Sequence, residues 1–154
     1  SSRVSNPKTA QNKLMGSCLC GQIRYRINGH CRNIIRRYCD NYRRTNAYLA
    51  AYTLVDKSDL VLISEQSLKC CYDNAPNIYR GLCRNCGSNL SWQRGNSNYL
   101  VLRNQLSVAA GTLDSGHDLQ TAGDIYALEA GEYYKIEYEP PQFNASKNGK
   151  LEVK

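Results

Sequence analysis

The chain has 154 residues, of which 42% are hydrophobic, and its formal net charge is +7. This length suits one domain with a modest core, and no apolar run approaches the roughly 18–20 residues that a membrane-spanning helix needs. The amino-terminal residues lack the apolar segment of a secretory signal peptide, so we expect a cytoplasmic protein that does not enter a membrane.

Short apolar or alternating stretches predict a mainly β protein. Predicted strands cover residues 22–27, 48–55, 60–63, 68–72, 79–82, 89–94, 99–103 and 133–138. Asn28-Gly29 predicts a tight turn. Residues 30–47 are arginine-rich and allow a short helical turn or a loop. Residues 74–77 are predicted to form a loop. We therefore expect a β domain over 14–143, between a flexible lead-in (1–13) and a polar tail (144–154).

Eight cysteines are many for this length and fit either a disulfide scaffold or metal thiolates. Cys18 and Cys20 form a Cys-x-Cys pair, and Cys83 and Cys86 form a Cys-x-x-Cys pair before Gly87, where the turn favours positive φ. Such close pairs chelate well and rarely bond to each other, which favours metal. Four thiolates suit a tetrahedral structural zinc, a coordinatively closed site that would clamp two segments 62 residues apart.

Several motifs in fixed order resemble the glutathione-dependent formaldehyde-activating enzyme (GFA) family, which also includes centromere protein V. The motifs are G-S-C-L-C-G-Q-I-R-Y (16–25), R-G-L-C-R-N-C-G-S-N-L (80–90), A-G-T-L-D (110–114), D-I-Y-A-L-E (124–129) and P-Q-F (141–143). The resemblance implies small coiled antiparallel β-sheets with one structural zinc on Cys18, Cys20, Cys83 and Cys86. It also implies a carbon–sulfur lyase that condenses formaldehyde with glutathione.

In that family a second, catalytic zinc is implied at a Cys-His-Cys-x-x-Cys-Arg motif, which falls here on residues 37–43. Only Cys39, the candidate catalytic residue, and Arg43, the candidate binding residue for a thiol or anionic ligand, match it. The non-matching positions carry Arg37, Tyr38 and Tyr42, and Asp124 stands where a histidine often occurs. A lone thiolate beside an arginine is a poor zinc site, so we expect altered or absent lyase activity. Rebuilding of the site by other side chains stays open for His30, Cys31, Cys70 and Cys71.

Three functions remain in competition. The chain can be a lyase acting on glutathione or another thiol–aldehyde adduct through rearranged ligands. It can be a non-catalytic scaffold whose Arg/Tyr-rich segment 24–48, with seven of the twelve arginines, binds a small anion or nucleic acid. No groove-reading motif supports sequence-specific binding. Finally, Cys39 can be a reactive thiol activated by neighbouring arginines, or an ordinary cysteine beside solvated ones.

Overall fold

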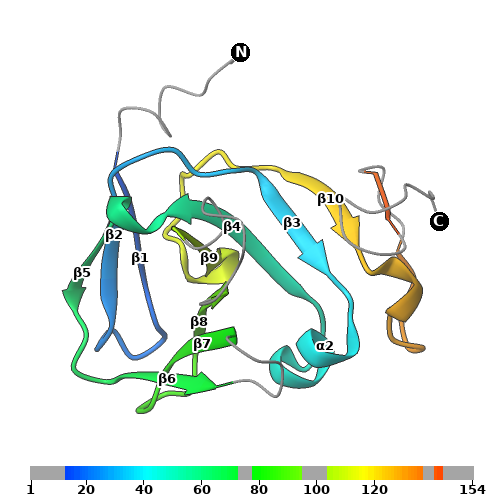
Figure 1. Cartoon of the computed structure of the whole chain (residues 1–154), viewed down its shortest axis with the longest axis horizontal. Coiled ribbons are helices and arrows are strands. Elements are labelled where there is room, and N and C mark those ends of the chain that lie inside the picture. The colour runs from blue at the N-terminus through cyan, green and yellow to red at the C-terminus, as the bar shows by residue number, and fades with distance from the viewer. Residues whose placement is uncertain (1–12, 73–77, 95–103, 137–140, 144–154) are drawn as a thin grey trace. The chain divides into compact units, whose positions relative to one another are not determined.

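The structure is a computed structural model, and it describes residues 13–72, 78–94, 104–136 and 141–143. Over these residues the protein is mainly β (Figure 1), which confirms the predicted fold class. The chain forms two compact units: Ser1–Arg32 with Thr53–Leu119, and Asn33–Tyr52 with Gln120–Lys154. The predicted tail, the 74–77 loop, the 99–103 strand and all but the last residue of the lead-in lie outside the described residues.

The helices and strands carry the labels of Figure 1. They are β1 (Leu14–Ser17), β2 (Arg24–Ile27), β3 (Ile34–Arg37), α2 (Asp40–Asn46), β4 (Ala50–Asp56), β5 (Leu60–Ser64), β6 (Leu68–Tyr72), β7 (Ile78–Cys83), β8 (Asn89–Arg94), β9 (Gln105–Ala109) and β10 (Thr121–Ile125), with single 3-10 turns at Lys57–Asp59, Ala110–Thr112 and Ala127–Glu129. No helix among the described residues is long and apolar enough to cross a membrane.

The first unit contains a three-stranded antiparallel sheet in the order β1-β2-β5. Tyr25 on β2 lies opposite Gly16 on β1, and its hydroxyl is 2.6 Å from the Thr112 hydroxyl. A Cβ on Gly16 would come within 2.3 Å of the Tyr25 ring, so only glycine lets the ring lie across β1. This contact fixes the 110–114 segment against the sheet, where Leu113 also bridges Gly16.

A second sheet of the first unit has the order β9-β8-β7-β6, and the last residues of β4 also belong to this unit. Its β6, β7, β8 and β9 pair antiparallel, with Cys70 opposite Gly81 and Ser91 opposite Val108. Side chains of alternate residues therefore point to the same face of this sheet.

The second unit is built on the strand order β10-β3-β4, in which β10 runs parallel to β3. Its apolar cluster is Ile35, Ile125 and Phe143. The Phe143 N–H donates to the Asp124 carbonyl at 2.7 Å, which ties the P-Q-F segment to β10. Parallel strands need a long connection, and here 83 residues separate Arg37 from Thr121 in the sequence.

The strands predicted at 68–72 and 89–94 match β6 and β8, and those at 22–27, 48–55, 60–63 and 79–82 overlap β2, β4, β5 and β7. The region 30–47, for which the sequence allows a helical turn or a loop, holds both β3 and α2. The strand predicted at 133–138 is wrong for its described part: residues 132–133 form a turn and 134–136 pair with no strand. In this segment Tyr133 is exposed, and its ring contacts the Tyr134 ring edge-on at 4.8 Å between centroids.

Burial of Tyr25 gives the fold a defined alkaline limit. Burial raises the pKa of Tyr25 from 10.0 to about 12. The folded state then holds this proton more tightly than the unfolded chain, so its stabilising effect is complete below pH 10 and is lost as the pH rises to about 12. We expect urea unfolding to show a loss of about 2 kcal/mol over this range.

The variant Tyr25→Phe should lose about 1 kcal/mol at neutral pH, because the hydrogen bond to Thr112 is gone, and should show a shallower alkaline decline. Tyr133→Phe is the matched control, since that ring is 64% exposed. An alkaline profile of Tyr25→Phe that overlays the parent would contradict this account.

Candidate functional site

The four predicted zinc ligands meet in the first unit. The sulfur atoms of Cys18, Cys20, Cys83 and Cys86 all lie within 4.8 Å of one another. Cys18 and Cys20 are 3.6 Å apart, and Cys20 and Cys83 are 3.8 Å apart. A disulfide needs about 2.05 Å, whereas four sulfurs at about 2.3 Å from a tetrahedral ion are separated by about 3.8 Å. The arrangement therefore fits a metal thiolate site.

The two cysteine pairs sit in turns of the same design. Cys18 N–H donates to the Ile23 carbonyl at 3.0 Å, and Cys83 N–H donates to the Ser88 carbonyl at 2.9 Å, five residues ahead in both cases. Gly21 and Gly87 follow the second cysteine of each pair with φ of +80° and +82°, as the sequence predicts for Gly87. Glycine adopts a positive φ without strain. The glycine after each cysteine pair therefore lets the chain turn so that both thiols of the pair face the cluster.

Backbone N–H groups also point at the sulfurs. Ile23 donates to the Cys18 sulfur at 3.3 Å, and Cys86 donates to the Cys83 sulfur at 3.4 Å. Such N–H···S bonds stabilise negative charge on a thiolate. Hydrogen bonds of this kind from the surrounding backbone are typical of metal centres with thiolate ligands.

Ser88 is a site residue that sequence reasoning missed. Its hydroxyl accepts the Leu19 N–H at 3.0 Å and lies 3.2 Å from the Cys86 sulfur, so it joins the two turns. Bonding to Ser88 lowers the pKa of Cys86 to about 5, whereas burial raises the pKa of Cys83 to about 11. The only sequence signal was the serine that follows Cys-x-x-Cys-Gly.

The residues at the second motif do not form a comparable cluster. Cys39 is half-buried directly before α2, where its carbonyl accepts the Arg43 N–H at 2.9 Å. The side chain of Arg43 forms an ion pair with Asp40 at 3.0 Å. In the parts of the chain that the structure describes, the four-thiol group is the only set of three or more His, Cys, Asp or Glu side chains close enough to hold a metal.

The motif positions that lack metal ligands are occupied by an aromatic–arginine stack. The Arg37 guanidinium lies over the Tyr42 ring at 4.3 Å from its centroid and over the Tyr126 ring at 5.2 Å. Tyr42 is buried and packs edge-on against Tyr52 at 5.7 Å. Arg37 also donates to the Tyr42 hydroxyl at 3.4 Å. The negative faces of aromatic rings stabilise a cation placed over them, and the charge of the guanidinium disfavours a metal ion nearby.

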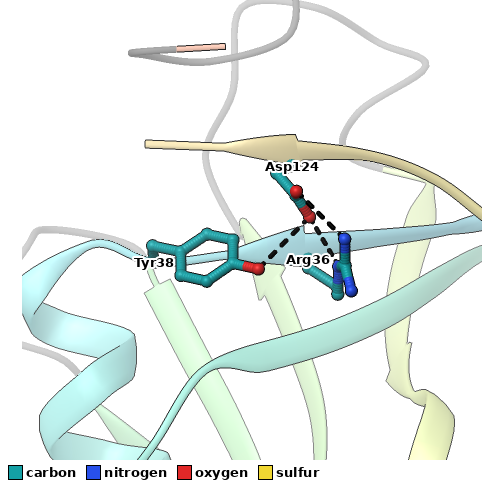
Figure 2. A network of polar contacts seen from close by, with 3 residues as sticks. All are labelled: Arg36, Tyr38 and Asp124. Carbon is teal, nitrogen blue, oxygen red and sulfur yellow. Dashed lines mark hydrogen bonds and ion pairs between the residues drawn. The ribbon is translucent and has the colours of Figure 1, made fainter. Parts of the chain in front are cut away.

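Beside this stack lies a buried polar network, drawn in Figure 2. Arg36 on β3 donates to both carboxylate oxygens of Asp124 on β10, at 2.5 and 3.0 Å, and the Tyr38 hydroxyl donates to the same carboxylate at 3.3 Å. Asp124 is fully buried. Burial, with the nearby Asp124 charge, raises the pKa of Tyr38 above its usual range, so Tyr38 stays a proton donor to the carboxylate.

The other side chains considered for a rebuilt site are dispersed. His30 and Cys70 are exposed, while Cys31 is buried, and its burial raises its pKa to about 11. The Cys71 side chain lies outside the described residues. His117 accepts the Leu119 N–H at 3.0 Å, a local turn contact.

A polar cavity of about 480 Å³ borders Arg43 in the second unit. It is lined by Asp40, Arg43 and residues 129–133. Glu129 accepts the Asp40 N–H at 3.0 Å, which holds this segment on the start of α2. With one guanidinium and three carboxylates, the lining offers both charge signs to a small ligand.

Together, the mainly β fold and the paired cysteine turns define a protein with a cluster of four thiols that can hold a metal ion. Residues 13–129 match the family model described as glutathione-dependent formaldehyde-activating enzyme, and the chain belongs to this family. Among solved structures, a Rhodobacter sphaeroides protein is similar, with 19% identity and a TM-score of 0.49, over 68% of this chain and 91% of that one. The comparison with curated proteins gave no match.

Removal of one thiol tests the metal site. Cys83 is fully buried, so Cys83→Ser should abolish metal binding and lower the free energy of unfolding by about 4 kcal/mol or more. Elemental analysis and thermal unfolding measure both effects. Cys70→Ser, which changes an exposed thiol outside the cluster, should retain the parent's metal content and stability; equal metal content in both variants would rule out the four-thiol site.

The buried ion pair between Arg36 and Asp124 leads to a second prediction. Asp124→Asn leaves the Arg36 charge buried without its carboxylate, and we expect the free energy of unfolding to fall by about 3–5 kcal/mol in urea titrations. Asp40→Asn breaks the exposed pair with Arg43 and should cost less than about 1 kcal/mol. The double variant Arg36→Met/Asp124→Leu should recover much of the loss, because no charge then remains buried. Equal losses of unfolding free energy in Asp124→Asn and Asp40→Asn would contradict a larger stabilising role for the buried pair.

Proposed function

We propose that the chain is a one-zinc member of the GFA family whose carbon–sulfur lyase reaction is altered or absent. The observation that carries this proposal is the Arg37 guanidinium over the Tyr42 ring, 4.3 Å from its centroid. These are two of the positions where the family motif implies thiolate ligands. A cation–π stack at these positions supplies no metal ligand, and its positive charge opposes the binding of a second metal ion.

The ion at the four thiols is proposed to be zinc. Four cysteine sulfurs at these separations suit a tetrahedral d¹⁰ ion, and such a site has no open position for a substrate. When bound, zinc would hold the two cysteine turns together through Cys18, Cys20, Cys83 and Cys86. Its role is structural, and a reducing compartment such as the cytoplasm would keep these thiols available to it.

A second candidate function is the binding of a small ligand such as glutathione at the cavity beside Arg43. Glutathione carries carboxylates and an ammonium group, and the cavity offers one guanidinium and three carboxylates. A nucleic-acid backbone is less well matched there, since the carboxylates would repel it. In the arginine-rich segment, moreover, Arg36 pairs with Asp124 and Arg37 stacks on Tyr42.

The proposal predicts one zinc ion per chain and no catalysed formation of S-hydroxymethylglutathione. Elemental analysis of the purified chain gives the zinc content, and NMR of a formaldehyde–glutathione mixture measures adduct formation above the uncatalysed rate. Two zinc ions together with clear turnover would refute the proposal.

Titration of the same sample with glutathione separates binding from catalysis. Binding without turnover that weakens at least tenfold in Arg43→Gln supports the ligand role of this cavity. Arg44→Gln is the matched control, because Arg44 is a neighbouring exposed arginine that does not line the cavity. Equal weakening in both variants points to general electrostatic attraction instead, which increasing salt would abolish.

A further inference from the structure

The first unit contains an apolar pocket of about 170 Å³ that the family function does not use. Its walls come from β2 and β5 of one sheet and from β6, β7, β8 and β9 of the other. None of the four clustered thiols lines it, nor does any residue of the 37–43 motif. Protein interiors hold few voids larger than a water molecule, so a pocket of this size requires a specific cause.

The cause is a row of small side chains across the second sheet. The register places Cys70 opposite Gly81, Gly81 opposite Ser91, and Ser91 opposite Val108. Directly paired residues point to the same face, and all four line the pocket. Gly81 has no side chain, and the Ser91 hydroxyl lies close to where a Cβ on Gly81 would be. This row therefore presents only small groups to the pocket, whereas two tightly packed sheets would have large apolar side chains there.

The pocket has a buried floor and an open rim. Ile23 and Val108 are each 1% exposed and form part of the floor. Leu60, Leu62 and Leu106 line the walls but are only half-buried, and Cys70 at the rim is exposed. These three leucines therefore line the pocket while part of their surface stays accessible.

The size and lining define the ligand. A cavity of about 150 Å³ lined by aliphatic and aromatic side chains binds benzene, so this pocket fits one six-membered ring with a small substituent. The Tyr25 ring forms part of the wall, and its hydroxyl is engaged outside the pocket by Thr112. Ser91 and Gln93 add a hydroxyl and an amide on the β8 side, which suit one hydrogen-bonding group on the ligand.

We infer that the first unit binds a single-ring aromatic molecule with one polar substituent between its two sheets, at the row Cys70–Gly81–Ser91. This site goes beyond the proposed family function, because it lies in a different unit from the 37–43 motif and includes no metal ligand. A long acyl chain does not fit the volume.

The probe is 4-methylphenol, titrated into the full-length, metal-loaded chain. Binding should shift the NMR methyl signals of Leu62 and Val108, with saturation in the millimolar range or below, and should raise the midpoint of thermal unfolding. Toluene, which lacks the hydroxyl, should bind more weakly. Absence of saturable shifts, or shifts away from the pocket, would overturn the inference, as would a preference for dodecanoate.

A filling variant tests the location. Ser91→Leu places an isobutyl group in the pocket and should weaken 4-methylphenol at least tenfold. Ser107→Leu is the matched control, because Ser107 precedes Val108 on β9 and its side chain points to the opposite face; it should bind the probe as the parent does. Unchanged affinity in Ser91→Leu would refute the site. If Ser91→Leu does not fold, Cys70→Phe at the exposed rim replaces it. The added ring should cover the opening and weaken 4-methylphenol binding at least tenfold, and unchanged affinity would refute the site.

Discussion

The first unit depends on the closure of four thiols into one cluster. Cys18 and Cys20 follow the first strand, whereas Cys83 and Cys86 belong to the turn between β7 and β8. An ion bound to all four joins one sheet to the other and closes a loop of more than sixty residues, whose entropy the unfolded chain would otherwise retain.

Five strands of the first unit, β2, β5, β6, β7 and β8, could be predicted because each is a short apolar or alternating run of residues, whereas β1 and β9 are missed. β6 and β8 match their predicted bounds, since turns at 65–67 and 84–87 separate short runs of apolar residues. β3 could not be predicted: Ile34, Ile35 and Arg36 are all buried, so alternation is missing. Its parallel partner β10 lies far along the sequence. In addition, an arginine on a strand is predicted to be at the surface, and only its ion pair with Asp124 explains why Arg36 is buried.

The clustering of the four thiols could be predicted because the spacing of the two cysteine pairs restricts it, and the backbone of Gly87 could be predicted because its turn demands positive φ. Ser88 could not be assigned, since its role depends on Leu19 coming close from the other turn. The small-residue row at Cys70, Gly81 and Ser91 is equally invisible in sequence, because it appears only once the register of three strands is fixed. Motifs that identify the family also prove to be contact points: Thr112 bonds Tyr25, and Phe143 bonds Asp124 through the backbone.

In the second unit, contacts between side chains of the described residues satisfy buried polar groups. Arg36, Asp124 and Tyr38 satisfy one another inside the unit. The Arg37 guanidinium lies over the rings of Tyr42 and Tyr126. These contacts are coupled through shared atoms, because one Asp124 oxygen serves both Arg36 and Tyr38. Introducing a single metal ligand, such as histidine at position 38 or 124, would leave a buried charge or hydroxyl unpaired without completing a coordination sphere. The effects of changes within this network are therefore not additive, and a change at Asp124 affects the contacts of both Arg36 and Tyr38.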